Sequence, residues 1–80
     1  MKIRVLGFGI VKEIFRGSEI LFDMEAGKTT EELKHALEIK YPALKELNSF
    51  MVAINNQYAQ QAQLINSSDE IAIIPPVSGG

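Results

Sequence analysis

The residues whose types and spacing could support chemistry stand at the end of the sequence, in the run Pro75-Pro76-Val77-Ser78-Gly79-Gly80. Proline has no backbone N–H and fixes φ, so two successive prolines end strand pairing and favour an extended exit from a sheet. Glycine has no β-carbon, so Gly79-Gly80 is the thinnest backbone that a chain can present to another surface. Fully extended, six residues span roughly 20 Å, enough to carry a terminal carboxylate into a partner's pocket. The run therefore predicts that the C-terminal carboxylate is the reactive group.

Few other side chains offer a competing chemistry. The sequence has no cysteine, which excludes disulfides, thiolate metal sites and a cysteine nucleophile. The single histidine, His35, cannot build a metal site alone, and no carboxylates have the spacing of a metal-binding loop. We predict that His35 is a solvated side chain and that this chain binds no metal and no cofactor of its own.

Length and charge limit the class of protein. Eighty residues suit one domain. A formal net charge of −2 at pH 7 gives no electrostatic case for nucleic acid, which requires a basic face. Met1 is followed by charged and apolar residues in alternation, without a secretory segment or a long apolar stretch that could span a membrane. We therefore expect a cytoplasmic protein that binds neither nucleic acid nor membrane.

Hydrophobic patterns predict the strands that would hold the tail. Polar and apolar residues alternate in segments 2–6 and 18–25, and short apolar segments recur at 51–54 and 70–74; each predicts a strand. We interpret residues 57–63 as a loop or a short edge pairing, and Leu64-Ile65 as the anchor of a short strand. The wholly apolar run Ile71-Ala72-Ile73-Ile74 predicts a strand buried on both faces and therefore central in the sheet.

Two segments have helical spacing. Apolar residues at positions 10, 11, 14 and 15 predict a short amphipathic helix, with Gly17 as its C′ residue. Thr29, with Glu32 three residues later, matches a capping box and predicts the start of the main helix. Pro42 predicts its end, because proline disfavours the helical conformation at the preceding residue. The main helix would place four side chains on one face: Leu33, Ala36, Leu37 and Tyr41.

The order of these elements predicts an α+β fold. A mixed sheet with the main helix packed across one face would bury all the apolar positions named above. If the central last strand lies beside the first, the two must run parallel after the long crossover. We therefore predict a ubiquitin-like β-grasp domain over residues 1–74, followed by an extended C-terminal Gly-Gly tail over residues 75–80.

The end of the chain carries a family resemblance. Residues 69–80 read Asp-Glu-Ile-Ala-Ile-Ile-Pro-Pro-Val-Ser-Gly-Gly, and the chain resembles the ubiquitin-like sulfur carriers, in particular the small subunits of molybdopterin synthase. These typically end in Asp-Glu, an apolar residue, Ala, an apolar pair and Pro-Pro-Val-Ser/Thr-Gly-Gly, and every position fits. Ile54-Asn55 and Phe8 also match positions common in the family. Ser68 departs from it, because glycine usually precedes the Asp-Glu pair; this affects only a turn.

The resemblance implies a specific chemistry for the tail. In the family, an ATP-dependent adenylating enzyme converts the terminal glycine to an acyl-adenylate, and a sulfur donor turns it into a thiocarboxylate. The tail then inserts into the large subunit and donates its sulfur to cyclic pyranopterin monophosphate. Carried over to this sequence, Gly80 is the reactive residue and Gly79 supplies steric clearance. The resemblance also implies the residues that contact the partner: Phe8, Ile74, Pro75, Pro76, Val77 and Ser78.

On this interpretation the chain is one subunit of a sulfurtransferase and not an enzyme by itself. The implied partners are the molybdopterin synthase large subunit, in a heterotetramer of two large and two small subunits, and an adenylating enzyme that uses ATP. Three alternatives stay open. One is a related carrier for thiamin or tRNA thiolation, although the Pro-Pro-Val-Ser run before the glycines favours molybdopterin synthesis. The others are a ubiquitin-like modifier attached to target lysines and an interaction domain with an inert tail.

Overall fold

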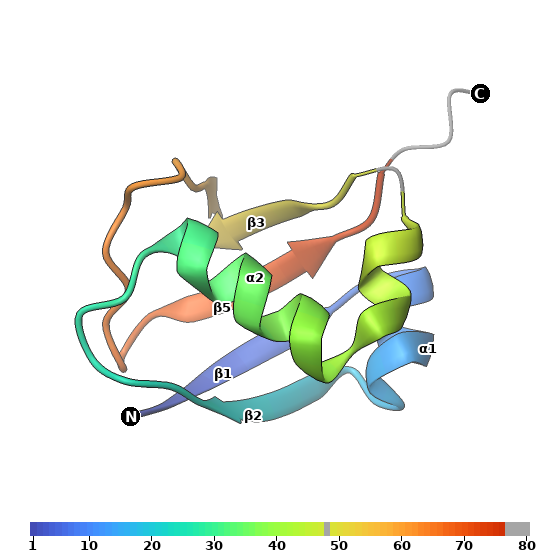
Figure 1. Cartoon of the computed structure of the whole chain (residues 1–80), viewed down its shortest axis with the longest axis horizontal. Coiled ribbons are helices and arrows are strands. Elements are labelled where there is room, and N and C mark those ends of the chain that lie inside the picture. Colours follow the sequence, from blue (N-terminus) through green and yellow to red (C-terminus); the bar gives the residue numbers. More distant parts are fainter. Residues whose placement is uncertain (48, 77–80) are drawn as a thin grey trace.

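The computed structural model describes residues 1–47 and 49–76. Its strands form one sheet, and the main helix crosses in front of that sheet in Figure 1. The elements, in chain order, are β1 (Lys2–Gly7), α1 (Ile10–Phe15), β2 (Glu19–Asp23), α2 (Thr30–Lys40), a 3₁₀ helix (Pro42–Glu46), β3 (Met51–Ile54), β4 (Gln57–Tyr58) and β5 (Glu70–Ile74).

The sheet has five strands in the order β2-β1-β5-β3-β4. β1 and β5 pair in parallel, whereas the β1–β2, β3–β5 and β3–β4 pairs are antiparallel. This arrangement confirms the predicted mixed sheet, with the last strand at its centre beside the first. It also confirms the ubiquitin-like β-grasp, in which the chain end leaves from the middle of the sheet.

The two faces of β5 differ. Ile71 and Ile73 are fully buried, whereas Ala72 and Ile74 are only half-buried. The prediction that β5 is buried on both faces is therefore wrong, although its central place is right. The reason is that α2 covers only one face of the sheet. Apolar residues on the other face, such as Ala72 and Ile74, therefore do not pack into the core.

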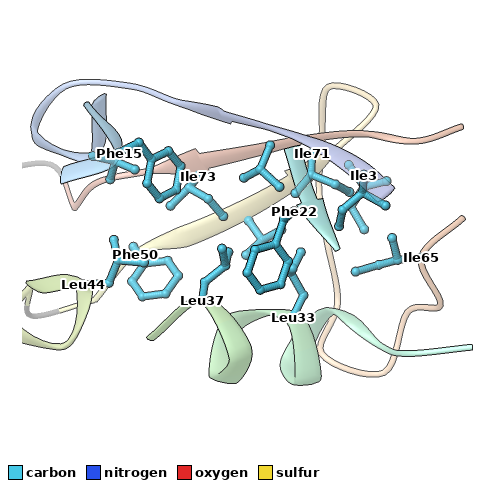
Figure 2. Packing of buried hydrophobic residues seen from close by; sticks show 14 residues of the cluster. Ile3, Phe15, Phe22, Leu33, Leu37, Leu44, Phe50, Ile65, Ile71 and Ile73 are labelled. Carbon is cyan, nitrogen blue, oxygen red and sulfur yellow. The ribbon is translucent and has the colours of Figure 1, made fainter. Parts of the chain in front are cut away.

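The core lies between α2 and the covered face of the sheet. Leu33 and Leu37 are fully buried, and Figure 2 shows both side chains pointing from α2 toward the strands. The predicted capping box is confirmed: the Thr29 N–H donates to Glu32 Oε1 at 3.0 Å, and the Glu32 N–H donates to Thr29 Oγ1 at 3.3 Å. The other core residues are Ile3, Val5, Val11, Phe15, Phe22, Leu44, Phe50, Val52, Ile54, Ile65, Ile71 and Ile73.

The short helix α1 ends one residue earlier than predicted. Arg16, with φ of 60°, takes the left-handed conformation, and the Gly17 N–H donates to the Lys12 carbonyl at 3.0 Å. This is a Schellman arrangement in which Arg16, not Gly17, is the C′ residue. Phe15, the last residue of α1, is buried, and the chain turns at Arg16 directly after it.

The segment between β3 and β5 contains less pairing than predicted. Asn55 and Asn56 both have positive φ and form a tight turn, after which Tyr58 pairs with Ala53. Residues 64–65 do not form a strand: Leu64 makes a single bridge to Thr29, and Ile65 is buried in the core. None of the helices within residues 1–47 and 49–76 is long and apolar enough to cross a membrane.

Candidate functional site

The tail starts at the centre of the sheet. β5 ends at Ile74, and the chain continues into Pro75 and Pro76, which are half-buried and lie outside any strand. This agrees with the expectation that the proline pair ends strand pairing. The remaining predicted site residues lie outside the described part of the chain: Val77, Ser78, Gly79 and Gly80.

The turn between β1 and α1 lies against this starting point. The Phe8 N–H donates to the Ile73 carbonyl at 3.4 Å, which extends the β1–β5 pairing to the end of the strand. Gly9 follows, so close to the tail that a β-carbon on it would lie 3.1 Å from Pro75 Cγ. The structure thus brings Phe8 and Pro75, predicted from distant parts of the sequence, to the same corner of the sheet.

Apolar side chains continue from this corner over the face that α2 leaves uncovered. In the register of the sheet, Leu6 pairs with Ala72, Ala72 with Ala53, and Ala53 with Tyr58. Met51 pairs with Ile74, and Phe8 follows Gly7, the partner of Ile73. We call this set the open apolar face; its members are Leu6, Phe8, Met51, Ala53, Tyr58, Ala72 and Ile74.

The open apolar face is hollowed at its centre. A shallow depression of about 310 Å³ lies among Leu6, Phe8, Ala53, Asn56, Tyr58, Glu70, Ala72 and Ile74. Ala53 and Ala72 leave room because their side chains are single methyl groups, whereas Phe8 and Tyr58 are 50% and 65% exposed. Exposed aromatic side chains beside a concave apolar surface are typical of a protein-binding site.

Charged residues border the open apolar face on the side of β2. Arg4 Nη2 lies 2.6 Å from Glu19 Oε1, and Arg4 also pairs with Glu70 in the sheet register. The hydrogen bond from Arg4 lowers the pKa of the Glu19 carboxyl, and the Glu19 carboxylate raises the pKa of the Arg4 guanidinium. A partner that covers the apolar part therefore meets ionised groups at this edge.

Two of the residues that line this depression can exchange a proton, Tyr58 and Glu70. The lining residues include no histidine, lysine or cysteine, and the described residues contain no group of three or more potential metal ligands from His, Cys, Asp and Glu. His35 is exposed on α2, in a separate hollow of about 480 Å³ that shares no residue with the open apolar face. The lining of the depression in the open apolar face is mainly apolar, which suits the binding of a partner.

Sequence reasoning missed most of the open apolar face. The family resemblance led to Phe8 and Ile74, whereas Tyr58 was left without a role and four further members were predicted only as parts of strands: Leu6, Met51, Ala53 and Ala72. The sequence did contain a signal for this face. In a sheet open to water on one side, alternate positions are expected to be polar, yet Leu6, Ala72 and Ile74 are apolar at such positions.

Comparison of the sequence with known proteins identifies the family of this chain. A family model described as the ThiS family matches residues 5–80. The chain belongs to the ThiS family. It is 36% identical over its full length to the molybdopterin synthase sulfur carrier subunit of Arabidopsis thaliana, of which 84% is covered. The protein of that name from Dictyostelium discoideum is 39% identical over 99% of this chain and 96% of its own length. The predicted resemblance to the ubiquitin-like sulfur carriers is confirmed.

Solved structures of similar proteins share the fold of this ThiS-family chain. The putative molybdopterin converting factor subunit 1 of Pyrococcus furiosus superposes with a TM-score of 0.86 at 17% identity, over 96% of this chain and 99% of the other. The small archaeal modifier protein 1 of Methanosarcina acetivorans gives 0.78 at 28% identity, over 99% and 96%. A chain of the complex of subunits 1 and 2 of the Helicobacter pylori molybdopterin-converting factor gives 0.68 at 23%, over all of both chains.

Proposed function

We propose that this chain is the sulfur carrier subunit of a molybdopterin synthase and that Gly80 carries the sulfur. The observation that supports this most directly is where the tail begins: Pro75 follows the central strand β5 beside the open apolar face. A partner seated on that face would have the tail within reach of its own pocket. Full-length similarity to two sulfur carrier subunits supports the same role.

The chemistry begins with activation of a poor electrophile. A carboxylate oxygen of Gly80 attacks the α-phosphate of ATP in the adenylating enzyme, and pyrophosphate leaves. A sulfur donor at the oxidation level of sulfide then attacks the acyl carbon, and AMP leaves with the bonding electrons. The product is a thiocarboxylate in which sulfur has replaced one carboxylate oxygen. Glycine leaves the reacting carbon unhindered for both attacks.

Sulfur transfer takes place in a second partner. The large subunit holds cyclic pyranopterin monophosphate, receives the tail and supplies the general base, because Glu70, the carboxylate among the lining residues, lies at the start of β5, whereas the tail begins after Ile74 at its end. The thiocarboxylate sulfur attacks a carbon of the pterin precursor and an oxygen substituent of that carbon leaves. Water then hydrolyses the resulting thioester, which leaves the sulfur on the pterin and restores the Gly80 carboxylate. We further propose a heterotetramer of two large and two small subunits, and a cytoplasmic location, where ATP and reduced sulfur are at hand.

The face that α2 leaves uncovered is the proposed seat of the large subunit. Phe8 and Ile74 lie at the end where the tail begins, and Tyr58 lies across the depression from Phe8. Aromatic anchors around a small-residue hollow suit a partner side chain that inserts between Phe8 and Tyr58. Arg4, Glu19 and Glu70 then form a charged rim on one side.

Mass spectrometry tests the carrier role directly. The intact protein is incubated with ATP, an adenylating enzyme of this class and a sulfur source. We expect a mass gain corresponding to one oxygen replaced by sulfur, located on the C-terminal glycine. An unchanged mass under conditions that load a known carrier would contradict the proposal. Conversion of the pterin precursor after addition of a large subunit distinguishes molybdopterin synthesis from thiamin or tRNA thiolation.

A ubiquitin-like modifier is the second candidate. The 28% identity to the small archaeal modifier protein 1 of Methanosarcina acetivorans favours it, and an activated terminal glycine could equally acylate a lysine amine. Isopeptide conjugates on cellular proteins, found without any thiocarboxylate form, would select the modifier.

A further inference from the structure

Gly9 occupies a backbone conformation that side chains disfavour. Its φ of 56° and ψ of −130° place it at the first central position of a type II′ turn, which the hydrogen bond from the Val11 N–H to the Phe8 carbonyl closes at 3.0 Å. Glycine is the default residue there because a β-carbon would crowd the backbone. This requirement is local and says nothing by itself about the tail.

A second requirement at Gly9 does involve the tail. A β-carbon at this position would lie 3.1 Å from Cγ and 4.0 Å from Cδ of Pro75. The first distance is shorter than an ordinary carbon–carbon contact, so a side chain would press on the proline ring. Pro75 is the first residue after β5 and therefore the first residue whose position sets the direction of the tail.

The turn that contains Gly9 has little room to retreat from Pro75. On one side, the Phe8 N–H is bonded to the Ile73 carbonyl. On the other side, α1 packs so closely on β1 that a β-carbon at Gly7 would lie 2.9 Å from Phe15 Cδ2. Phe15 is itself buried in the core. An added side chain at Gly9 would therefore displace Pro75 more readily than it displaces the turn.

We infer that Gly9 is a positioning residue for the carrier tail: its missing side chain lets Pro75 seat against the β1–α1 turn and so aims the tail. This inference rests on the proposed function. Since Gly80 is five residues beyond Pro75, a small change of direction at Pro75 grows along an extended tail. The open apolar face would still bind the large subunit, because Gly9 is not part of it, and only the predicted partner contact of Pro75 would shift. The defect should therefore be larger in sulfur transfer than in docking.

The chain offers a matched control for backbone strain. Gly27 also has positive φ, of 84°, but a β-carbon on it would meet no atom within 4 Å. Gly9→Val and Gly27→Val therefore both introduce a β-branched residue at positive φ, and only the first pushes on Pro75. Each variant is loaded with sulfur and mixed with the large subunit and its pterin precursor. Thermal unfolding, the Kd for the large subunit and the single-turnover transfer rate are measured.

We expect Gly9→Val to lower the transfer rate roughly tenfold or more relative to Gly27→Val, since displacement of a reacting group by about 1 Å can cost a hundredfold. The Kd should change by a smaller factor than the transfer rate, because the open apolar face does not include Gly9. Adding Pro75→Ala, which removes the Cγ and Cδ atoms that the new side chain meets, should restore part of the rate. Pro75→Ala alone measures the cost of losing the proline.

Three results would overturn the inference: equal transfer rates for the two valine variants, a loss confined to the Kd, or no rescue by Pro75→Ala. If Gly9→Val fails to fold, Gly9→Ala and Gly27→Ala are compared in the same way, because alanine adds only the β-carbon. Failure of the wild-type protein to accept or donate sulfur would instead contradict the proposed function. Normal activity of the wild type together with normal activity of Gly9→Val would contradict this inference alone.

Discussion

Two glycines act through the side chains that they lack, at opposite ends of the chain. Gly80 leaves its carboxyl carbon open to attack in the proposed reaction, and Gly9 leaves room for Pro75 where the tail begins. Substitutions at such positions change how closely the tail approaches its neighbours more than they change the packing of the core. They should therefore separate function from stability, which substitutions in the core cannot do.

Replacing Gly80 with leucine should abolish sulfur loading or transfer, because a branched side chain crowds the reacting carbon and the path of the tail; we expect a loss of roughly a hundredfold or more. The thermal unfolding temperature should stay the same, since the paired strand β5 ends at Ile74. Loading is followed by intact mass, transfer by product formation and stability by circular dichroism. A large fall in the unfolding temperature would mean that the tail has a structural role.

At the scale of single elements, α2 is specified by its first turn and by its buried face. The capping box of Thr29 and Glu32 satisfies N–H groups that the helix cannot satisfy itself. Leu33 and Leu37 then hold the helix on the sheet. These features depend on residues three or four positions apart, which is why the sequence pattern alone located the helix.

Leu37→Ala should lower the free energy of unfolding by roughly 2–5 kcal/mol, because it removes a fully buried side chain and leaves a cavity under α2. Urea or thermal denaturation measures the change. Ile39→Ala is the control on the same helix, since Ile39 is 65% exposed and should cost less than about 1 kcal/mol. Similar losses at the two positions would contradict the described packing of α2.

Glu32 should make the stability of α2 depend on pH. The hydrogen bond from the Thr29 N–H lowers the pKa of the Glu32 carboxyl below its ordinary value of 4.5. A lowered folded-state pKa means that the ionised carboxylate stabilises the fold above pH 4.5 and that this contribution is lost as the pH falls through the folded-state value. The stability difference between wild type and Glu32→Gln should therefore be largest near neutral pH and shrink in acid.

Thermal unfolding of both proteins across that pH range measures the difference. Glu31→Gln is the matched control, because Glu31 lies in the same helical turn but is not the capping residue. A pH profile for Glu31→Gln identical to that for Glu32→Gln would assign the effect to the helix dipole and contradict the capping role.

At the scale of the whole molecule, the sheet has two different faces. One packs against α2 to form the core, and the other presents the open apolar face beside the start of the tail. This division of the sheet gives a small chain both a core and, in the proposed function, a docking surface. It also explains why β5 is apolar at every position from Ile71 to Ile74.

Phe8→Ala should weaken binding of the large subunit by roughly tenfold or more, as expected for an aromatic anchor whose loss costs at least 1–2 kcal/mol. Its unfolding temperature should change little, because the Phe8 ring is 50% exposed. Ile39→Ala, an exposed apolar residue on α2 outside the open apolar face, is the control and should bind normally. Calorimetry with the purified large subunit measures the affinity of each variant. Equal affinities of Phe8→Ala and Ile39→Ala would contradict a docking site that includes Phe8.

The sequence by itself determined the capping box, the main strands and, through the order of those elements, the β-grasp; the reactive end of the tail stays a prediction from the sequence. These signals are local: they depend on neighbouring residues or on a repeat of two to four positions. Local signals were weaker at the end of α1, where the sequence did not show whether Arg16 or Gly17 takes the left-handed conformation. They were also weaker at Leu64, which forms a single bridge and not a strand.

Only the tertiary structure decided which apolar residues are buried in the core and which lie on the open apolar face. Ile73 and Ile74 look alike in the sequence, yet one faces α2 and is fully buried while the other borders the open depression. The contact of Gly9 with Pro75 and the row from Leu6 to Tyr58 likewise join residues far apart in the chain. Strand order and register create these neighbours, and neither is written in the spacing of residues along the sequence.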